Sequence, residues 1–87
     1  MIHRASPKFW KFYKVLPQEV RELADRNYEL LKRDPYHPSL HFKKIGRIHS
    51  VRVGIHYRAL AVAESDDIVW FWIGHHSEYD GLIGRLA

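Results

Sequence analysis

The chain has 87 residues, no cysteine and a formal net charge of +4 at pH 7. This length predicts a single domain over residues 1–87, because a second hydrophobic core would not fit into so short a chain. Without cysteine, disulfide scaffolds, thiolate zinc sites and cysteine nucleophiles are excluded. The positive charge favours an anionic partner such as nucleic acid or an acidic peptide. A basic protein without such a partner is the alternative interpretation.

The sequence also bears on the location of the protein. Its first residues contain no apolar segment of signal-peptide length, and its longest apolar run, residues 68–73, is too short to cross a bilayer. The lack of cysteine fits a reducing compartment. We therefore expect a cytoplasmic protein with no membrane partner.

The first third of the chain shows helical periodicity. Ser6 followed by proline is typical of a helix N-cap and first helical position, and apolar residues then recur at spacings of three and four. This pattern predicts a helix over residues 7–16. Pro17 starts a second helix, predicted over residues 17–34, which ends ahead of Pro35 because a residue before proline disfavours the helical conformation. The two helices are expected to form a hairpin.

The remainder of the chain has the composition of strands. Residues 49–53 and 57–62 are rich in β-branched and aromatic residues, and the three residues between them are few enough for an antiparallel hairpin. Residues 68–73 form an unbroken apolar run, which predicts a strand covered on both faces and ended by Gly74. The aromatic residues of this run are expected in the core: Trp70, Phe71 and Trp72.

Three other segments give weaker signals. They are residues 2–5 as an edge strand, residues 41–45 as a further strand, and residues 78–86 as a short terminal helix that its two glycines weaken. The sequence thus predicts an α+β fold, with an N-terminal helical hairpin packed on a small antiparallel β-sheet and a short C-terminal helix.

Two motifs stand out in the second half of the chain. They are Arg-Val-Gly-x-His-Tyr-Arg at residues 52–58 and Ile-Gly-x-His-x-Glu-Tyr-Asp at residues 73–80. In this order and spacing, and with the proline-bounded loop ahead of residues 40–43, they resemble the RelE/ParE superfamily of toxins. The second motif is similar to the ending of the YafQ and HigB branches. The resemblance covers nearly the whole chain.

The resemblance implies a RelE-like fold and the toxin of a type II toxin–antitoxin system, neutralised by a cognate antitoxin protein. In the RelE-like branches it further implies a ribosome-dependent, metal-independent endoribonuclease, or mRNA interferase, that cleaves mRNA and arrests translation. The partners would then be mRNA and the 16S and 23S RNA of the ribosome, with no metal and no small-molecule cofactor. Two alternatives stay open: a ParE-like toxin that inhibits DNA gyrase by binding, and an inactive relative that retains antitoxin binding.

Metal-free cleavage of RNA has three chemical requirements. The 2′-hydroxyl must be deprotonated, the charge that grows on the phosphate must be stabilised, and the departing 5′-oxygen must be protonated. Arg52 and Arg58 suit the second role, because a guanidinium binds two phosphate oxygens and stays charged. They are expected on neighbouring strands, where both project from one face if the register permits. The alternative is that both are ordinary exposed strand arginines.

The resemblance assigns two further residues to the catalytic set. His76 matches the family's C-terminal catalytic position and is the candidate general acid or base, since an imidazole exchanges protons near neutral pH. Tyr79 is expected either to stack on a base or donate its phenolic proton, or to pack on Trp72 as a structural residue. Which residue acts as the base stays open. Gyrase-inhibiting members generally lack this basic and histidine set, so its presence favours the nuclease.

Other basic residues occupy places comparable to functional positions of the family. The candidate RNA-binding residues are His41, Lys43, Lys44 and His56. His75, in contrast, is expected to point away from the site. No metal site is predicted, because the His75–His76 pair lacks two further ligands at recognisable spacing.

Overall fold

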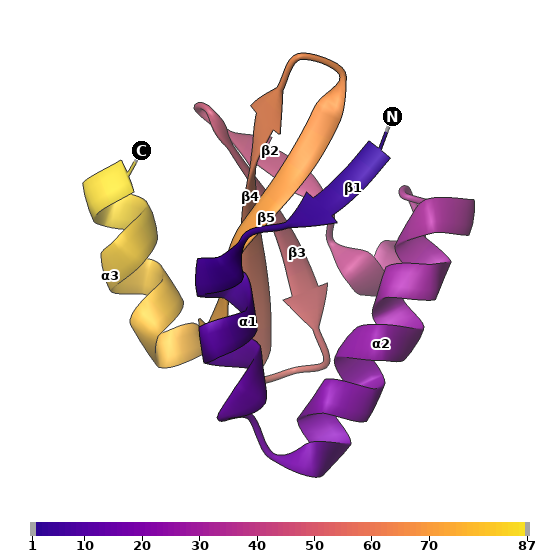
Figure 1. Ribbon diagram of the computed structural model, residues 1–87, viewed down its shortest axis with the longest axis vertical. Coiled ribbons are helices and arrows are strands. Elements are labelled where there is room, and N and C mark those ends of the chain that lie inside the picture. Colours follow the sequence, from indigo (N-terminus) through magenta and orange to yellow (C-terminus); the bar gives the residue numbers. More distant parts are fainter. Residues whose placement is uncertain (1, 87) are drawn as a thin grey trace.

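A computed structural model describes residues 2–86, which form one curved β-sheet with helices on both of its faces (Figure 1). No helix among these residues is long and apolar enough to span a membrane. In chain order the elements are β1 (Ile2–Ala5), α1 (Pro7–Lys14), α2 (Gln18–Arg33), a 3-10 helix η1 (Pro38–Leu40), β2 (Lys43–Ile45), β3 (Ile48–Val53), β4 (Tyr57–Glu64), β5 (Asp67–His75) and α3 (His76–Leu86).

The sheet has the strand order β1-β5-β4-β3-β2. Neighbouring strands are antiparallel except β1, which runs parallel to β5. The expectation of a purely antiparallel sheet is therefore wrong. The helical hairpin is not N-terminal either, because it is preceded by β1, which forms at residues 2–5, where a weak sequence signal predicts an edge strand. Side chains alternate in the same way along parallel and antiparallel strands, so the sequence of β1 does not indicate the direction in which it pairs. The α+β class is confirmed, and β5 lies between two strands, as its apolar run predicted.

The two predicted N-terminal helices form, each slightly shorter than expected. The Ser6 Oγ caps α1 by accepting a hydrogen bond from the backbone N of Phe9 at 3.2 Å. The helices are joined where the Tyr13 hydroxyl donates to Asp25 Oδ1 at 2.8 Å. They do not form a separate layer, because α1 packs against β5 and α2 against β3.

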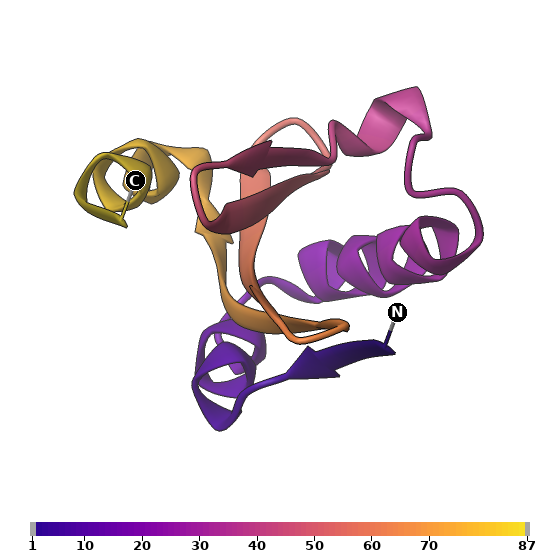
Figure 2. The same ribbon diagram turned by 90° about the horizontal axis from the view of Figure 1, so that it is seen from above.

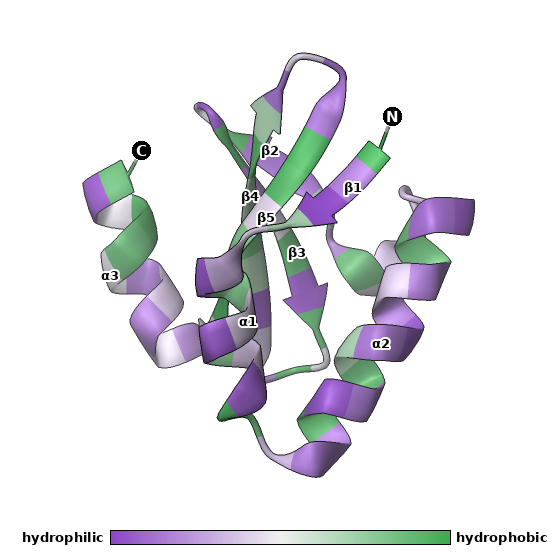
Figure 3. Ribbon diagram, in the orientation of Figure 1, coloured by the Kyte–Doolittle hydropathy of each residue, from purple (hydrophilic) through white to green (hydrophobic). Residues whose placement is uncertain are grey.

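Different helices cover the two faces of the sheet, α2 one face and α3 the other (Figure 2). Because side chains alternate along a strand, each strand contributes to both faces. Val51, Val53 and Leu31 belong to the buried cluster on the α2 side. Leu60 and Tyr79 belong to the cluster on the α3 side. Hydrophobic and hydrophilic residues alternate along α2, as expected of a helix with one buried face (Figure 3).

A β-bulge between β4 and β5 decides where the tryptophans of β5 lie. Leu60 pairs with Trp72 and Ala61 with Trp70, so Phe71 has no residue opposite it. Residues two apart in a regular strand share a face, but this bulge sends Trp70 to the α2 cluster and Trp72 to the α3 cluster. Both tryptophans are buried, as predicted, whereas Phe71 is only partly buried.

β5 continues through Gly74 to His75, so the expectation that Gly74 ends the strand is wrong. The Trp72 indole lies over this position: a Cβ on residue 74 would stand 2.5 Å from Trp72 Cζ2. Glycine thus makes room for a large side chain within the strand. β5 leads directly into α3 at His76 with no loop between them.

Candidate active site

Arg52 and Arg58 face each other across the β3–β4 hairpin. Their Cα atoms are paired in the register of the two strands, which places both side chains on the same face of the sheet. That face is the α3 side, since Ser50 and Leu60, two residues away on each strand, are also paired with each other and Leu60 lies in the α3 cluster. Both arginines are half-buried. The sequence-based expectation that they share a face agrees with this register.

The two guanidinium groups have no carboxylate partner. Within residues 2–86, only Arg4 and Lys32 form ion pairs. Arg58 Nη1 donates to the backbone oxygens of Tyr57 at 2.8 Å and Ile55 at 3.4 Å, and Arg52 Nε is buried without an acceptor. Like charges placed directly opposite on neighbouring strands repel each other. An anion between the two side chains would remove this repulsion and satisfy the free donors.

Tyr79 lies beneath Arg58 in the α3 cluster. Its ring centroid is 5.9 Å from the Arg58 guanidinium carbon, a cation–π arrangement. Its hydroxyl accepts a hydrogen bond from Ser50 Oγ at 3.3 Å. The side chain is 9% exposed and packs with Trp72, so its ring is not open to a nucleic-acid base. Of the two expectations for Tyr79, the arrangement favours the structural one, with the added effect of positioning Arg58.

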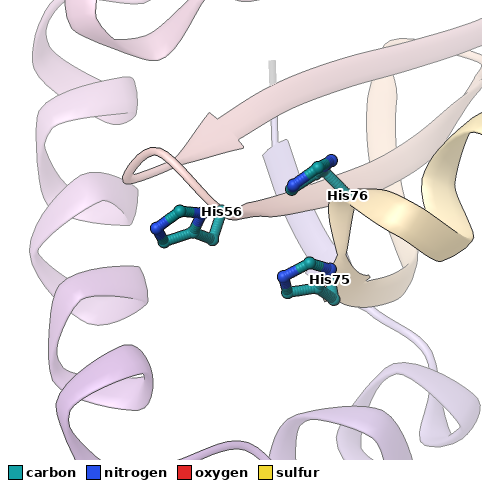
Figure 4. Close-up of side chains that lie close together, drawn as sticks. All are labelled: His56, His75 and His76. Atoms are coloured by element: carbon teal, nitrogen blue, oxygen red, sulfur yellow. The ribbon is translucent and has the colours of Figure 1, made fainter.

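His56, His75 and His76 gather at the corner where the β3–β4 turn, the end of β5 and the start of α3 meet (Figure 4). The ring centroids of His75 and His76 are 4.5 Å apart, and that of His56 is 6.1 Å from each. The backbone N of His76 donates to the His56 oxygen at 2.7 Å, which fixes the turn against α3. The site residue His76 thus lies near the hairpin that carries both arginines.

The sequence-based expectation was that His75 points away from the site. His75 is paired with Tyr57, on the face of the sheet opposite to Arg58, and its ring packs on the Tyr57 ring with 5.4 Å between the centroids. Its ring also lies beside that of His76, the first residue of α3. Ser77 holds the His75 ring: its backbone N donates to His75 Nδ1 at 3.2 Å, and its Oγ lies 2.9 Å from the same atom.

The structure separates the candidate RNA-binding residues. Lys43 is paired with Ser50 and therefore projects on the face of the arginines, whereas Lys44 is paired with His49 on the opposite face. In agreement with this, the pKa of His49 is lowered, first by burial and then by the charge of Lys44. His41 is exposed, in a left-handed conformation with φ of 45°, in the loop ahead of β2. His56 alone of the four belongs to the histidine cluster.

A separate apolar cavity of about 260 Å³ lies on the other side of the sheet. It is lined by side chains of β1, α1, α2 and the strands, including His3, Tyr28 and Trp70. Its only carboxylate, Asp25, is already bonded to the Tyr13 hydroxyl. The chemistry-bearing side chains therefore lie at the arginine and histidine corner, and we take that corner as the candidate active site.

The sequence pattern missed two residues of this corner, Ser50 and His75. The signal for Ser50 was its spacing of two from Arg52, which puts it on the same strand face. His75 could not be placed without knowing where β5 ends.

No family model matches the sequence, and no curated protein matches it at the sequence level. The fold is similar to that of solved toxin structures. A chain of the RelB–RelE antitoxin–toxin complex from Methanococcus jannaschii aligns with a TM-score of 0.70 and 24% identity, over 90% of this chain and 96% of that one. The isolated E. coli RelE toxin gives a TM-score of 0.63 and 12% identity, over 99% and 98% of the two chains. The YoeB dimer from Staphylococcus aureus gives a TM-score of 0.66 and 13% identity, over 87% of this chain and 97% of that one. The chain therefore has the RelE-like fold that the two sequence motifs predicted.

Proposed function

We propose that the chain is the toxin of a type II toxin–antitoxin system and acts as a ribosome-dependent, metal-independent endoribonuclease on mRNA. One observation carries the proposal: Arg52 and Arg58, half-buried and opposite each other, have no carboxylate partner and lie next to a group of histidines. A phosphate diester is the anion that such a pair of planar donors suits, and imidazole supplies the proton transfer that its cleavage requires.

In the proposed reaction, the 2′-oxygen of a nucleotide attacks the adjacent phosphorus, the bond from phosphorus to the 5′-oxygen breaks, and a 2′,3′-cyclic phosphate is left. Arg52 and Arg58 hold the phosphate oxygens while negative charge builds on them. His76 exchanges a proton with the attacking or the departing oxygen. Tyr79 acts on the reaction only through Arg58, whose guanidinium it positions by a cation–π contact.

The substrate contacts beyond the scissile phosphate are expected on the same face of the sheet. Lys43 projects there from the edge strand β2 and is exposed. His56, also exposed, lies on the turn beside Arg58. Such residues bind phosphates without distinguishing sequence, which suits a strand presented by the ribosome.

The proposed partner protein is a cognate antitoxin. The solved relatives with this fold include antitoxin–toxin complexes. A chain with net charge +4 and a small core gains both charge neutralisation and buried surface from an acidic, partly apolar segment that folds on it. We expect the affinity of this complex to fall as salt concentration rises.

The proposal is tested with the purified chain, programmed ribosomes and a reporter mRNA, with cleavage mapped by primer extension. Codon-phased cuts that need the ribosome and persist in a metal chelator are expected. A DNA gyrase supercoiling assay serves as the counter-test. Inhibition of supercoiling without mRNA cleavage would replace the nuclease by a gyrase inhibitor, and neither activity would indicate an inactive relative.

A further inference from the structure

The three histidines of the corner form a cluster of ring nitrogens whose chemistry is not limited to proton transfer. His56, His75 and His76 come from three segments, the turn at residues 54–56, the end of β5 and the start of α3. One ring nitrogen from each lies within 4.8 Å of the others. Figure 4 shows the three side chains close together at this corner.

This separation is close to that of a metal site. Zn²⁺ binds imidazole nitrogens at about 2.0–2.1 Å, so two ligands of a tetrahedral ion stand roughly 3.3 Å apart. The nitrogens must therefore approach by about 1.5 Å at most, a movement within reach of side-chain rotation. His56 is exposed and free to make it, while the hydrogen bond from the His76 N to the His56 oxygen keeps the two backbones in place.

Ser77 fixes the orientation of the His75 ring. Its backbone N–H donates to His75 Nδ1 at 3.2 Å, so Nδ1 carries the lone pair and the proton of the neutral ring resides on Nε2. Binding of a metal at Nε2 requires this proton to move to Nδ1, where Ser77 Oγ at 2.9 Å can accept it and the bond from the Ser77 N–H is lost. An oxygen acceptor behind a ligating histidine fixes the ring's orientation and raises its basicity.

We propose that His56, His75 and His76 bind one divalent transition-metal ion, with Zn²⁺ as the ion that the site takes and water in the fourth position. Three imidazoles without a carboxylate select such an ion over Mg²⁺ or Ca²⁺, which prefer oxygen ligands. The inference goes beyond the proposed nuclease. If that function holds, the ion occupies the nitrogen lone pair that His76 uses for proton transfer, and Zn²⁺ is a reversible inhibitor of cleavage.

Binding is measured on the purified, untagged chain by titrating Zn²⁺ against a chromophoric chelator. One ion per chain is expected, and His75→Ala and His56→Ala should each weaken binding by more than about 10-fold. His37→Ala is the matched control, because His37 lies ahead of η1 and outside the cluster. Histidine ring signals in NMR spectra should move with Zn²⁺ for residues 56, 75 and 76 and stay in place for the others. Tight binding that survives in both cluster variants, or that His37→Ala weakens equally, overturns the site.

A second measurement separates this site from the proposed function. Cleavage by the parent chain should fall on addition of Zn²⁺ and recover with chelator, whereas Zn²⁺ should change the rate of His75→Ala, relative to that variant's own rate without metal, much less. Stimulation of cleavage by Zn²⁺ would overturn the inhibitory role. A chain that binds one Zn²⁺ at the three histidines but cleaves no mRNA retains the metal site and removes the nuclease proposal.

Discussion

Arg52 and Arg58 are the residues on which the proposed chemistry depends. Both sit half-buried in a hairpin, where their mutual repulsion reduces stability unless an anion is bound. Proteins keep such arrangements where function requires them, because a preorganised charge needs no rearrangement when the reaction begins. Removal of either side chain is therefore expected to lower activity without loss of the fold.

We expect Arg52→Ala and Arg58→Ala each to reduce the single-turnover rate of mRNA cleavage on programmed ribosomes by about 100 to 1000-fold, as loss of one charge stabiliser does. Arg47→Ala is the control, since Arg47 is exposed in the turn between β2 and β3 and its loss removes the same charge. Thermal unfolding of the variants should show an intact fold. Rates equal to that of the parent in both site variants would remove the arginines from the active site.

His76→Ala is expected to lower the same rate by a factor of about 100 or more, because a positioned proton donor or acceptor contributes typically that much. In the absence of metal, His75→Ala should lower the cleavage rate much less than His76→Ala does. The two histidines are neighbours in contact, so the comparison isolates the role of one ring from a general effect on the corner. Equal losses in the two variants would contradict the assignment of His76.

His3 provides a test of stability at the residue scale. The Trp70 indole N–H donates to His3 Nδ1 at 3.1 Å, which requires that nitrogen to be unprotonated. Burial lowers the pKa of His3, and the charge of Lys32 acts in the same direction. A lowered folded-state pKa means that the unfolded chain binds the proton more readily, so stability is full above the unfolded pKa of about 6.5 and is lost as pH falls below it.

The free energy of unfolding should therefore drop more for the parent than for His3→Gln when pH is lowered from about 7.5 to about 5. Glutamine can still accept from the indole but does not titrate. Urea unfolding of both chains at several pH values measures the difference. Parallel pH profiles would show that His3 does not contribute to acid sensitivity.

At the scale of elements, the β3–β4 turn is fitted closely to α2. Gly54 has a positive φ of 66°, and a Cβ there would stand 2.7 Å from Leu23 Cδ2. Gly46, in the β2–β3 turn, has nearly the same φ of 60° but nothing within 4 Å of its Cβ position. Substitutions at Gly46 and Gly54 can therefore distinguish the cost of backbone strain alone from the cost of strain combined with steric crowding.

Gly46→Ala should reduce the free energy of unfolding by about 1–2 kcal/mol, which is the cost of the left-handed conformation for an L-residue. Gly54→Ala carries the same strain and also displaces the Leu23 methyl group, and overpacking adds about 1–3 kcal/mol. Denaturant unfolding of the two variants gives the comparison. A smaller loss for Gly54→Ala than for Gly46→Ala would contradict the close approach of α2 to the turn.

Most elements could be predicted from periodicity and composition, because helices of 8 and 16 residues and strands of β-branched residues leave clear patterns. The features that were mispredicted depend on single contacts between distant segments. β1 pairs in parallel with the edge of β5, and the bulge at Phe71 places one tryptophan in each of the two hydrophobic clusters. Neither the pairing direction of β1 nor the bulge can be predicted from the local sequence pattern.

The candidate site was predictable in type but not in extent. The motif at residues 52–58 placed Arg52 and Arg58 on one hairpin, and their shared face followed from the register. The third histidine of the corner could not be foreseen, because it depends on β5 running into α3 without a loop. Likewise, Lys43 and Lys44 are neighbours in sequence and were treated alike, although strand alternation sends them to opposite faces.

At the scale of the whole molecule, the division of the sheet into two faces separates two tasks. The α2 face buries the larger hydrophobic cluster and the apolar cavity, while the α3 face carries both unpaired arginines beside the histidine corner. The net charge of +4 would attract RNA to the molecule as a whole, but only cations on the α3 face can contact a strand that reaches the site.

This division makes a prediction about RNA binding. A catalytically slowed chain such as Arg58→Ala should bind a short single-stranded RNA with an affinity that falls between about 50 and 200 mM salt. Adding Lys43→Ala should lower the slope of log affinity against log salt by roughly 0.7, the value for one phosphate contact to a single strand. Lys44→Ala removes the same charge from the opposite face and should change the slope much less. Fluorescence anisotropy titrations at several salt concentrations measure all three chains, and equal slopes for the two lysine variants would show that RNA does not lie along the arginine face.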